Sequence, residues 1–172
     1  MTPGDPHPEK LREGQLIVTQ VRFIADAMLG KLAKWLRILG CDVAFDPDIS
    51  DREIAERGRR EGRVILTRDT LLMRRRDVRD NHFLVHGDSY RDQLRQVVTH
   101  FSIDPEGGLF TRCVRCNEAL AGVDKRKAAS KVPPYVYETQ ESFSSCPRCG
   151  RIYWKATHWE EMERHRKEML GR

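Results

Sequence analysis

Two Cys-x-x-Cys pairs carry the clearest chemical signal in this sequence. Cys113 and Cys116 form the first pair, and Cys146 and Cys149 form the second, with 29 residues between the pairs. Four thiolates in this pattern match the tetrahedral coordination of Zn²⁺, so we predict a structural zinc ribbon. The alternative is two disulfides or four unrelated thiols. A zinc ribbon is rarely an enzyme by itself, so catalytic residues are expected ahead of it.

Four aspartates ahead of the ribbon lie where carboxylates could hold a catalytic cation. Asp26, Asp69 and Asp88 each follow an apolar run that is typical of a strand, and Asp51 begins a helix. Two carboxylates about 4 Å apart repel by on the order of 4 kcal/mol at an effective dielectric constant of about 20. Such a cluster is tolerable if it binds Mg²⁺ or Mn²⁺, which prefer oxygen ligands. The ion would activate water for attack on a phosphate.

Each aspartate also has a purely structural explanation. Asp26 could cap a helix, and Asp69 could cap the next helix or pair with Arg68. Asp51 could do no more than stabilise the positive amino end of its helix dipole, and Asp88 could be a turn residue. The joint placement of the four at the ends of predicted strands is what favours a metal site.

The spacing of apolar residues predicts the elements that would position these side chains. Strands are expected over residues 17–25, 42–46, 63–67 and 82–86, and a helix follows each of them. Strands that alternate with helices predict a mainly parallel sheet covered on both faces. Right-handed crossovers then bring the carboxyl ends of the strands to one edge, where open α/β sheets bind ligands.

Local signals predict where several of these helices begin and end. Ser50 and Glu53 form a capping box that places Asp51 in the first helical turn, and Gly62 ends that helix. A short basic helix is expected from residue 71 to residue 76, and Ser89 is expected to cap the next helix. A final helix is expected over 157–170, with Trp159, Met162 and Met169 as its apolar contacts. Asp46 and Asp48 are read as turn formers, and Cys41 as a small buried apolar residue.

Length and composition indicate a soluble protein with one domain and a small module. The 172 residues divide into a tail at 1–14, an α/β domain at 15–104, a linker at 105–110, and a ribbon with a terminal helix at 111–172. No apolar run approaches the roughly 20 residues of a membrane span. Reduced cysteines and a polar amino terminus without a signal-peptide core predict a cytoplasmic location.

Charge is distributed unevenly along the chain. The formal net charge is +5, and all of this excess lies in residues 111–172, because the charges of 1–110 cancel. A basic ribbon half is suited to polyanions, with a mixed solvated surface as the alternative. Cations near the acidic edge could contact phosphates, although charge runs are often only solvated. The candidates for such contacts are Lys31, Lys34, Arg37, Arg68, Arg74, Arg75 and Arg76.

Aromatic residues in the ribbon offer a second way to bind nucleic acid. They could stack on single-stranded bases or form the core of the ribbon. These residues are Tyr135, Tyr137, Tyr153 and Trp154. With four cysteines present, we interpret His158 as structural.

The motifs together resemble those of the Mut-seven C-terminal RNase family, a branch of the PIN-like nucleases. The first part of the chain carries FIADAMLGKLAKWLRILG at 23–40, DISDREI at 48–54 and ILTRD at 65–69. The last part carries RCVRCN at 112–117, VPPYVY at 132–137, CPRCGRIYW at 146–154 and HW at 158–159. The resemblance covers about residues 20–165.

This resemblance implies a PIN-like three-layer α/β/α fold and metal-dependent cleavage of RNA, which we expect to be single-stranded. By motif position, Asp26, Asp51 and Asp69 correspond to the first three acids of the family and Asp88 to the fourth. The alternative is a non-catalytic RNA-binding or adaptor protein that keeps the fold and the ribbon. A receiver domain and a haloacid-dehalogenase-type phosphatase are disfavoured, because Ala27 and Met28 follow Asp26 where those classes need further acids.

Overall fold

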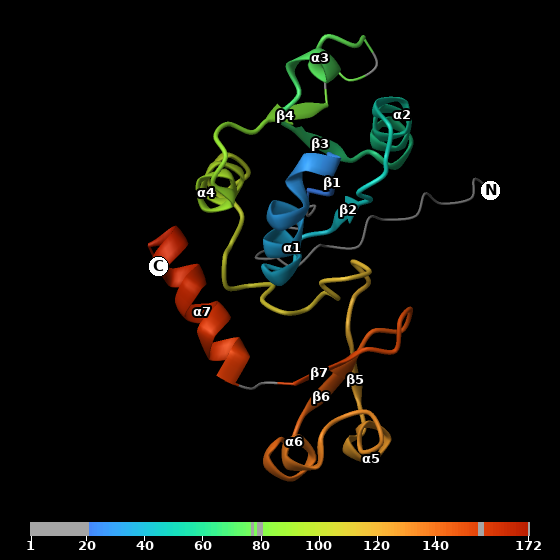
Figure 1. Cartoon of the computed structure of the whole chain (residues 1–172), viewed down its shortest axis with the longest axis vertical. Helices are drawn as coiled ribbons and strands as arrows, with labels where there is room; N and C mark the ends of the chain where they lie inside the picture. The colour runs from blue at the N-terminus through green and yellow to red at the C-terminus, as the bar shows by residue number, and fades with distance from the viewer. Residues whose placement is uncertain (1–20, 77, 79–80, 155–156, 172) are drawn as a thin grey trace, which may run out of the picture.

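Short strands and helices alternate from Phe23 to His100 in the computed structural model (Figure 1). The structure describes residues 21–76, 78, 81–154 and 157–171. The elements of the first part are β1 (Phe23–Ala25), the 3₁₀ turn η1 (Ala27–Leu29), α1 (Gly30–Ile38), β2 (Val43–Phe45), α2 (Asp51–Glu61), β3 (Val64–Thr67), α3 (Thr70–Met73), β4 (His82–Leu84) and α4 (Tyr90–His100). Those of the second part are β5 (Ala121–Val123), α5 (Lys125–Ala128), α6 (Pro134–Thr139), β6 (Phe143–Ser145), β7 (Ile152–Trp154) and α7 (Thr157–Leu170).

Four strands of the first part form one parallel sheet in the order β2-β1-β3-β4. In β1, Ile24 lies opposite Ala44 of β2 and Ile65 of β3. The predicted parallel sheet is therefore confirmed. Residues 17–20 of the first predicted strand lie outside the described part of the chain, and the strand begins at Phe23.

Helices cover both faces of the sheet, as the alternating pattern predicts. Phe23 and Leu66 face one side, where they pack with residues of α1 and α4. Ile24 and Ile65 face the other side, where they pack with residues of α2 and α3. Successive side chains of a strand point to opposite faces, so each buried strand supplies both cores.

Local sequence signals explain how α2 begins and ends. Ser50 accepts a hydrogen bond from the Glu53 backbone N–H, and the Glu53 carboxylate accepts one from the Ser50 N–H, so the predicted capping box is confirmed. Gly62 adopts the left-handed conformation that ends the helix. Asp51 is thereby held in the first turn, at the end of α2 that follows the carboxyl end of β2.

Two other helices differ in detail from their predictions. The predicted basic helix over 71–76 is wrong beyond Met73, because α3 ends there and Arg74 is its C-cap residue. Ser89 does precede α4, but its side chain makes no capping hydrogen bond. Arg74 and the next two arginines therefore follow α3 in a turn.

The second part forms a three-stranded antiparallel sheet, β5-β6-β7, with α5 and α6 inserted between β5 and β6. Its small core contains Ala128, Val132, Phe143 and Ile152, and Tyr137 and Trp154 pack against that core. Tyr135, by contrast, is 75% exposed. The core explanation therefore holds for Tyr137 and Trp154 and fails for Tyr135.

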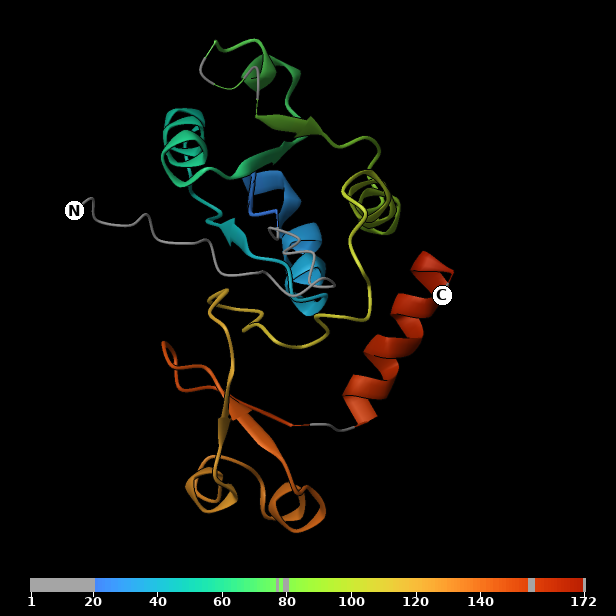
Figure 2. The ribbon, with the colours of Figure 1, turned by 180° about the vertical axis from the view of Figure 1, so that it is seen from behind.

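The end of the chain returns to the first domain. Figures 1 and 2 show α7 leaving the ribbon and running back beside α4. Met169 is buried in the core that α1 and α4 share, and Met162 packs against it. The side chains of Trp159 and His158 lie outside the described residues. The sequence groups this helix with the ribbon, whereas its buried contacts are with the α/β domain.

The segment predicted as a linker packs closely on the end of α1. The Phe110 backbone N–H donates to the Ile38 carbonyl at 2.8 Å. Gly40, which has a φ of +85°, lies so close to Gly108 that a Cβ on Gly40 would come within 2.1 Å of the Gly108 carbonyl oxygen. This contact requires glycine at position 40 and ties the ribbon to the α/β domain. Within the described residues, no helix is both long and apolar enough to span a membrane.

Candidate active site and metal centre

The strand order reverses between β1 and β3, whose carboxyl ends lie side by side. From β1 the chain crosses to β2 on one side, and later enters β3 on the other side of β1. Ligands of open α/β sheets bind at such a point of reversal. Asp26 directly follows β1, and Asp69 follows β3 by two residues. The Asp26 backbone N–H bonds the Leu66 carbonyl at 2.9 Å, which holds the end of β1 against β3.

Thr67, the last residue of β3, links the two aspartates. Its hydroxyl donates a hydrogen bond to Asp26 Oδ2 at 2.8 Å and accepts one from the Asp69 N–H at 2.9 Å. Thr67 is fully buried, while Asp26 and Asp69 are half-buried. Asp69 Oδ1 also accepts a bond from the Leu71 N–H at 2.7 Å and so caps α3. In the described structure, no other hydrogen bond reaches either carboxylate, so one oxygen of each is available to a ligand.

The other two candidate acids are more exposed. Asp51 projects from the first turn of α2, and Asp88 lies in the loop after β4 and pairs with Arg68. Among the described residues, no group of three or more carboxylates is placed to hold a metal ion together. Mg²⁺ keeps several waters and needs only one or two protein carboxylates, a requirement that Asp26 and Asp69 can meet.

The basic residues proposed for RNA contact differ in their exposure and in their ion pairing. Lys31 and Lys34 on α1 and Arg74 after α3 are exposed. Arg68 is part of the Asp88 ion pair, and Arg75 is half-buried with contacts of its own. The exposed cations remain predictions for phosphate contacts.

The structure corrects the expectation for Arg37. This residue is only 5% exposed, and burial lowers the pKa of its guanidinium, against the attraction of the nearby Cys113 and Cys116 thiols. Its Nε donates to the Val43 carbonyl at 2.9 Å, and its Nη1 donates to the carbonyls of Val114 and Arg115 at 2.9 and 3.1 Å. Arg37 therefore joins α1 and β2 to the first Cys-x-x-Cys loop, and its buried guanidinium does not face solvent RNA.

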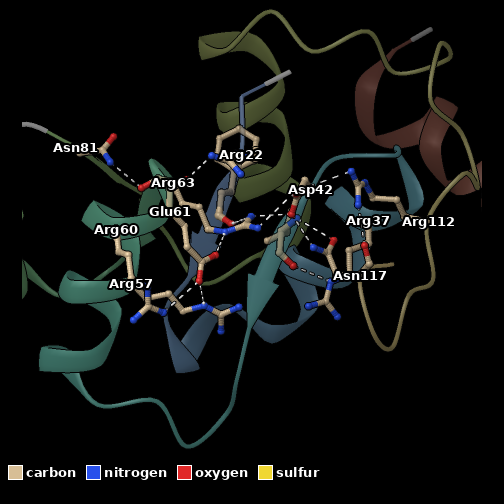
Figure 3. Close-up of polar contacts among 12 residues, drawn as sticks. Arg22, Arg37, Asp42, Arg57, Arg60, Glu61, Arg63, Asn81, Arg112 and Asn117 are labelled. Atoms are coloured by element: carbon tan, nitrogen blue, oxygen red, sulfur yellow. Dashed lines mark hydrogen bonds and ion pairs between the residues drawn. The ribbon is translucent and has the colours of Figure 1, made fainter. Parts of the chain in front are cut away.

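Asp42 joins the same two parts of the chain (Figure 3). Its carboxylate accepts bonds from Arg63 and from the side-chain amide of Asn117, both at 2.6 Å. The Asn117 Oδ1 in turn accepts a bond from the Val43 N–H at 2.9 Å. Burial opposes ionisation of Asp42, but the bonds from Arg63 and Asn117 prevail and lower its pKa. Asn117, which directly follows Cys116, is therefore hydrogen-bonded to the free edge of β2.

The four cysteines of the ribbon converge as the spacing predicts. Their Sγ atoms all lie within 4.8 Å of one another, and those of Cys113 and Cys149 are 3.8 Å apart. A tetrahedral ion with Zn–S bonds of about 2.3 Å requires sulfur atoms about 3.8 Å apart. All four are free cysteines, so the disulfide alternative does not apply here. The donor set and its spacing fit a structural Zn²⁺ ion.

Hydrogen bonds around Cys113 favour the thiolate that a metal requires. Burial would raise the pKa of this thiol, but bonds from the Tyr153 hydroxyl and from the backbone N–H groups of Cys116 and Arg115 lower the pKa to about 6. The Tyr153 oxygen lies 3.1 Å from Cys113 Sγ. Tyr153 thus contacts the cysteine cluster from outside the four candidate ligands and would orient one of them, a role that the sequence pattern does not single out.

Comparison with known protein families shows which family this chain belongs to. Residues 21–166 match the family model described as the Mut7-C RNAse domain. The chain belongs to the Mut7-C RNAse domain family. No curated protein and no solved structure matches it. The Mut7-C match spans both the parallel sheet and the cysteine cluster, so it treats them as parts of one family unit.

Within this Mut7-C chain, sequence reasoning missed several residues around the two sites. From the sequence, Thr67 is only a strand residue, because threonine is common in strands. Its position two residues before Asp69 could have indicated a hydrogen bond to that residue. Arg57, Arg115 and Arg148 were also missed. All three line a hollow beside β2 and are considered below.

Proposed function

We propose that this chain is a metal-dependent ribonuclease that hydrolyses RNA phosphodiester bonds at the carboxyl edge of its parallel sheet. The observation that carries the proposal is the link from Asp26 through Thr67 to Asp69 at the carboxyl ends of the neighbouring strands β1 and β3. Membership of an RNAse domain family supports RNA as the substrate. Exposed cations on α1 support the binding of a polyanion.

In this proposal, Asp26 and Asp69 each use one free carboxylate oxygen to hold Mg²⁺ or Mn²⁺. When bound, the ion lowers the pKa of a coordinated water and stabilises charge on the phosphate. Thr67 holds the Asp26 carboxylate in one orientation, and the cap of α3 holds that of Asp69. Asp51 would contribute from α2 through bridging waters. Asp88 would assist once Arg68 turns from it toward a phosphate.

The zinc ribbon has a supporting role in the proposal. Its residues hold the whole +5 charge excess of the chain, which favours contact with RNA. The four cysteines would bind Zn²⁺ as a structural ion, since all four ligand positions are filled by protein. Because all five cysteines are free thiols, we also propose a reducing, cytoplasmic location.

A specific observation favours a second candidate, an RNA-binding adaptor without catalytic activity. Asp69 already caps α3, and Asp88 is paired with Arg68, so two of the four acids have structural partners. An adaptor would bind RNA through the basic ribbon, and its aspartates at the strand ends would have no catalytic role.

Cleavage of single-stranded RNA by the zinc-loaded protein separates the two candidates. The ribonuclease should cut RNA when Mn²⁺ is added and should be inactive with zinc alone. The Asp26→Asn variant should bind RNA without cutting it. Wild-type protein that binds several RNAs and cuts none of them in Mn²⁺ would establish the adaptor.

A further inference from the structure

A hollow runs along the free edge of β2, between the α/β domain and the zinc ribbon. It has a volume of about 430 Å³ and is bordered by β2, by Arg57 of α2 and by both Cys-x-x-Cys loops. A second hollow of about 340 Å³ adjoins it, and the two share Asp46 and Arg57. Together they form one groove, called here the β2 groove.

The β2 groove connects the two functional parts of the molecule. Its first end lies at the amino end of β2, where Asn117 bonds the Val43 N–H beside the ribbon. Its second end includes Asp46, directly after β2, and Asp48, in the turn that leads to α2. Asp46 and Asp26 each follow neighbouring parallel strands, so the second end lies at the sheet edge that carries the proposed active site.

Two arginines in equivalent positions face the β2 groove from the ribbon. Arg115 and Arg148 each directly precede the second cysteine of their Cys-x-x-Cys pairs, and both line the first hollow. Both are exposed, and among the described residues no carboxylate forms an ion pair with either one. Two cations without an ion-pair partner among the described residues thus border one hollow from two separate loops.

The other arginines of the β2 groove are less available. Arg37 donates hydrogen bonds to three carbonyl groups, and Arg63 forms ion pairs with Asp42 and Glu61. Arg57, on the α2 wall, bonds Glu61 at 2.8 Å but keeps 39% of its side chain exposed. Arg60, which lines the second hollow, is paired with Glu56 and Glu61. The free positive charge at the ribbon end therefore comes from Arg115 and Arg148, with Arg57 opposite them.

The acidic groups nearby set the expected polarity of the groove. Asp48, Glu53 and Glu56 line the end toward the active site, whereas the two unpaired arginines lie at the ribbon end together with one carboxylate, Glu118. A phosphate chain is attracted to the ribbon end, and at the acidic end it requires a cation. The alternative role for Arg115 and Arg148 is to balance the charge of about −2 on a zinc ion with four thiolates.

We propose that the β2 groove holds the sugar-phosphate backbone of single-stranded RNA as it passes from the ribbon to the acidic edge of the sheet. Arg115, Arg148 and Arg57 would contact successive phosphates. This proposal rests on the proposed function, because it assigns the groove to the same RNA. Separate point cations along a groove suit one flexible strand, whereas duplex RNA is read by shape across a wide minor groove.

Binding of a fluorescent, unstructured oligouridine to the full, zinc-loaded chain tests this proposal. The measurement is made without Mg²⁺ or Mn²⁺, over a series of salt concentrations. The double variant Arg115→Ala/Arg148→Ala should bind on the order of tenfold more weakly, and its slope of log K against log [salt] should be shallower by about 1.4, since each phosphate contact to a single strand contributes roughly 0.7. The double variant Arg91→Ala/Lys167→Ala, exposed on α4 and α7, is the matched control and should bind like wild type.

Zinc content and thermal unfolding of each variant accompany the binding data. Retained zinc with unchanged RNA affinity in Arg115→Ala/Arg148→Ala overturns the proposal, as does equal weakening in the control. If that variant loses zinc, Arg57→Ala on the opposite wall decides the matter. Weaker binding by Arg57→Ala supports the groove, and unchanged binding overturns it. Absence of cleavage in Mn²⁺ by wild-type protein that binds normally would overturn only the proposed function.

Discussion

The hydroxyl of Thr67 donates a hydrogen bond of 2.8 Å to the Asp26 carboxylate. The same oxygen accepts a bond of 2.9 Å from the backbone N–H of Asp69, so one buried side chain sets the positions of two acids from different strands. The bond spans 41 positions in the sequence, between neighbouring parallel strands. The relative position of the two acids thus depends on a residue with no charge.

Replacing Thr67 tests this relationship. Thr67→Val keeps the shape of the side chain but removes the donor to Asp26 and the acceptor for Asp69. Unfolding free energy should fall by about 1–2 kcal/mol, which corresponds to a Tm lower by roughly 2–8 °C for a chain of this size. Thr67→Ser restores the hydroxyl and should recover most of the RNA cleavage that Thr67→Val loses. Equal cleavage by wild type and Thr67→Val would show that the link does not position the acids.

Substituting the two linked acids tests catalysis. Asp26→Asn and Asp69→Asn keep the side-chain size and one carbonyl oxygen, and asparagine still caps a helix, so both variants should fold. Metal-ion stabilisation is worth several kcal/mol, so cleavage in Mn²⁺ should fall by at least about a hundredfold while RNA affinity is kept. Asp92→Asn, a surface change on α4, is the control. Cleavage by Asp26→Asn at the wild-type rate would exclude this metal site.

Arg37 should matter for stability and not for the chemistry of RNA. Arg37→Met leaves three carbonyl acceptors without their donor at the junction with the ribbon, so we expect a loss of about 2–4 kcal/mol in unfolding free energy. Lys34→Met, on an exposed position of the same helix, should change stability by no more than about 0.5 kcal/mol. Chemical denaturation of both variants measures the difference. Equal stability of the two variants would contradict the role assigned to Arg37.

Zinc removal should affect more than the ribbon. Ligation of structural zinc is worth about 10–16 kcal/mol in small finger domains, so Cys149→Ser should unfold the ribbon. The first Cys-x-x-Cys loop also bonds Arg37 and β2, so hydrogen exchange should speed up at the end of α1 and in β2 as well. Elemental analysis should find one zinc ion per chain in wild type. Unchanged exchange in α1 and β2 after zinc loss would show that the two parts are energetically independent.

Ionised Glu61 should make the unfolding free energy fall as the pH is lowered. Burial opposes its ionisation, but bonds from Arg63 and Arg57 lower its pKa from 4.5 to about 2. The stability that ionised Glu61 contributes is present above pH 4.5 and is lost as the pH falls toward 2. The difference in unfolding free energy between wild type and Glu61→Gln should therefore shrink over that window. Glu56→Gln, whose ion pair to Arg60 spans 3.9 Å at the surface, should show a much smaller difference.

The sequence alone determined most of the elements and the four clustered cysteines, because these depend on short-range patterns. Ser50 and Glu53 form their capping box within one turn, and alternating strands and helices require a parallel sheet. Two Cys-x-x-Cys pairs predict a metal centre without knowledge of the fold around it. The acids at strand ends could be named for the same reason, since strands of a parallel sheet end at one edge.

Only the tertiary structure decided which side chains meet across long separations. Arg37 has the charge and spacing of a helix-surface cation, yet it is buried, because the first Cys-x-x-Cys loop covers the end of α1. Arg115 and Arg148 lie beside β2 only after the ribbon packs against that strand. Local patterns carry no information on such contacts, which form when distant segments bury their surfaces together. The family, the sheet and the cysteine cluster were therefore predictable from the sequence, whereas the Thr67 link and the β2 groove required the fold.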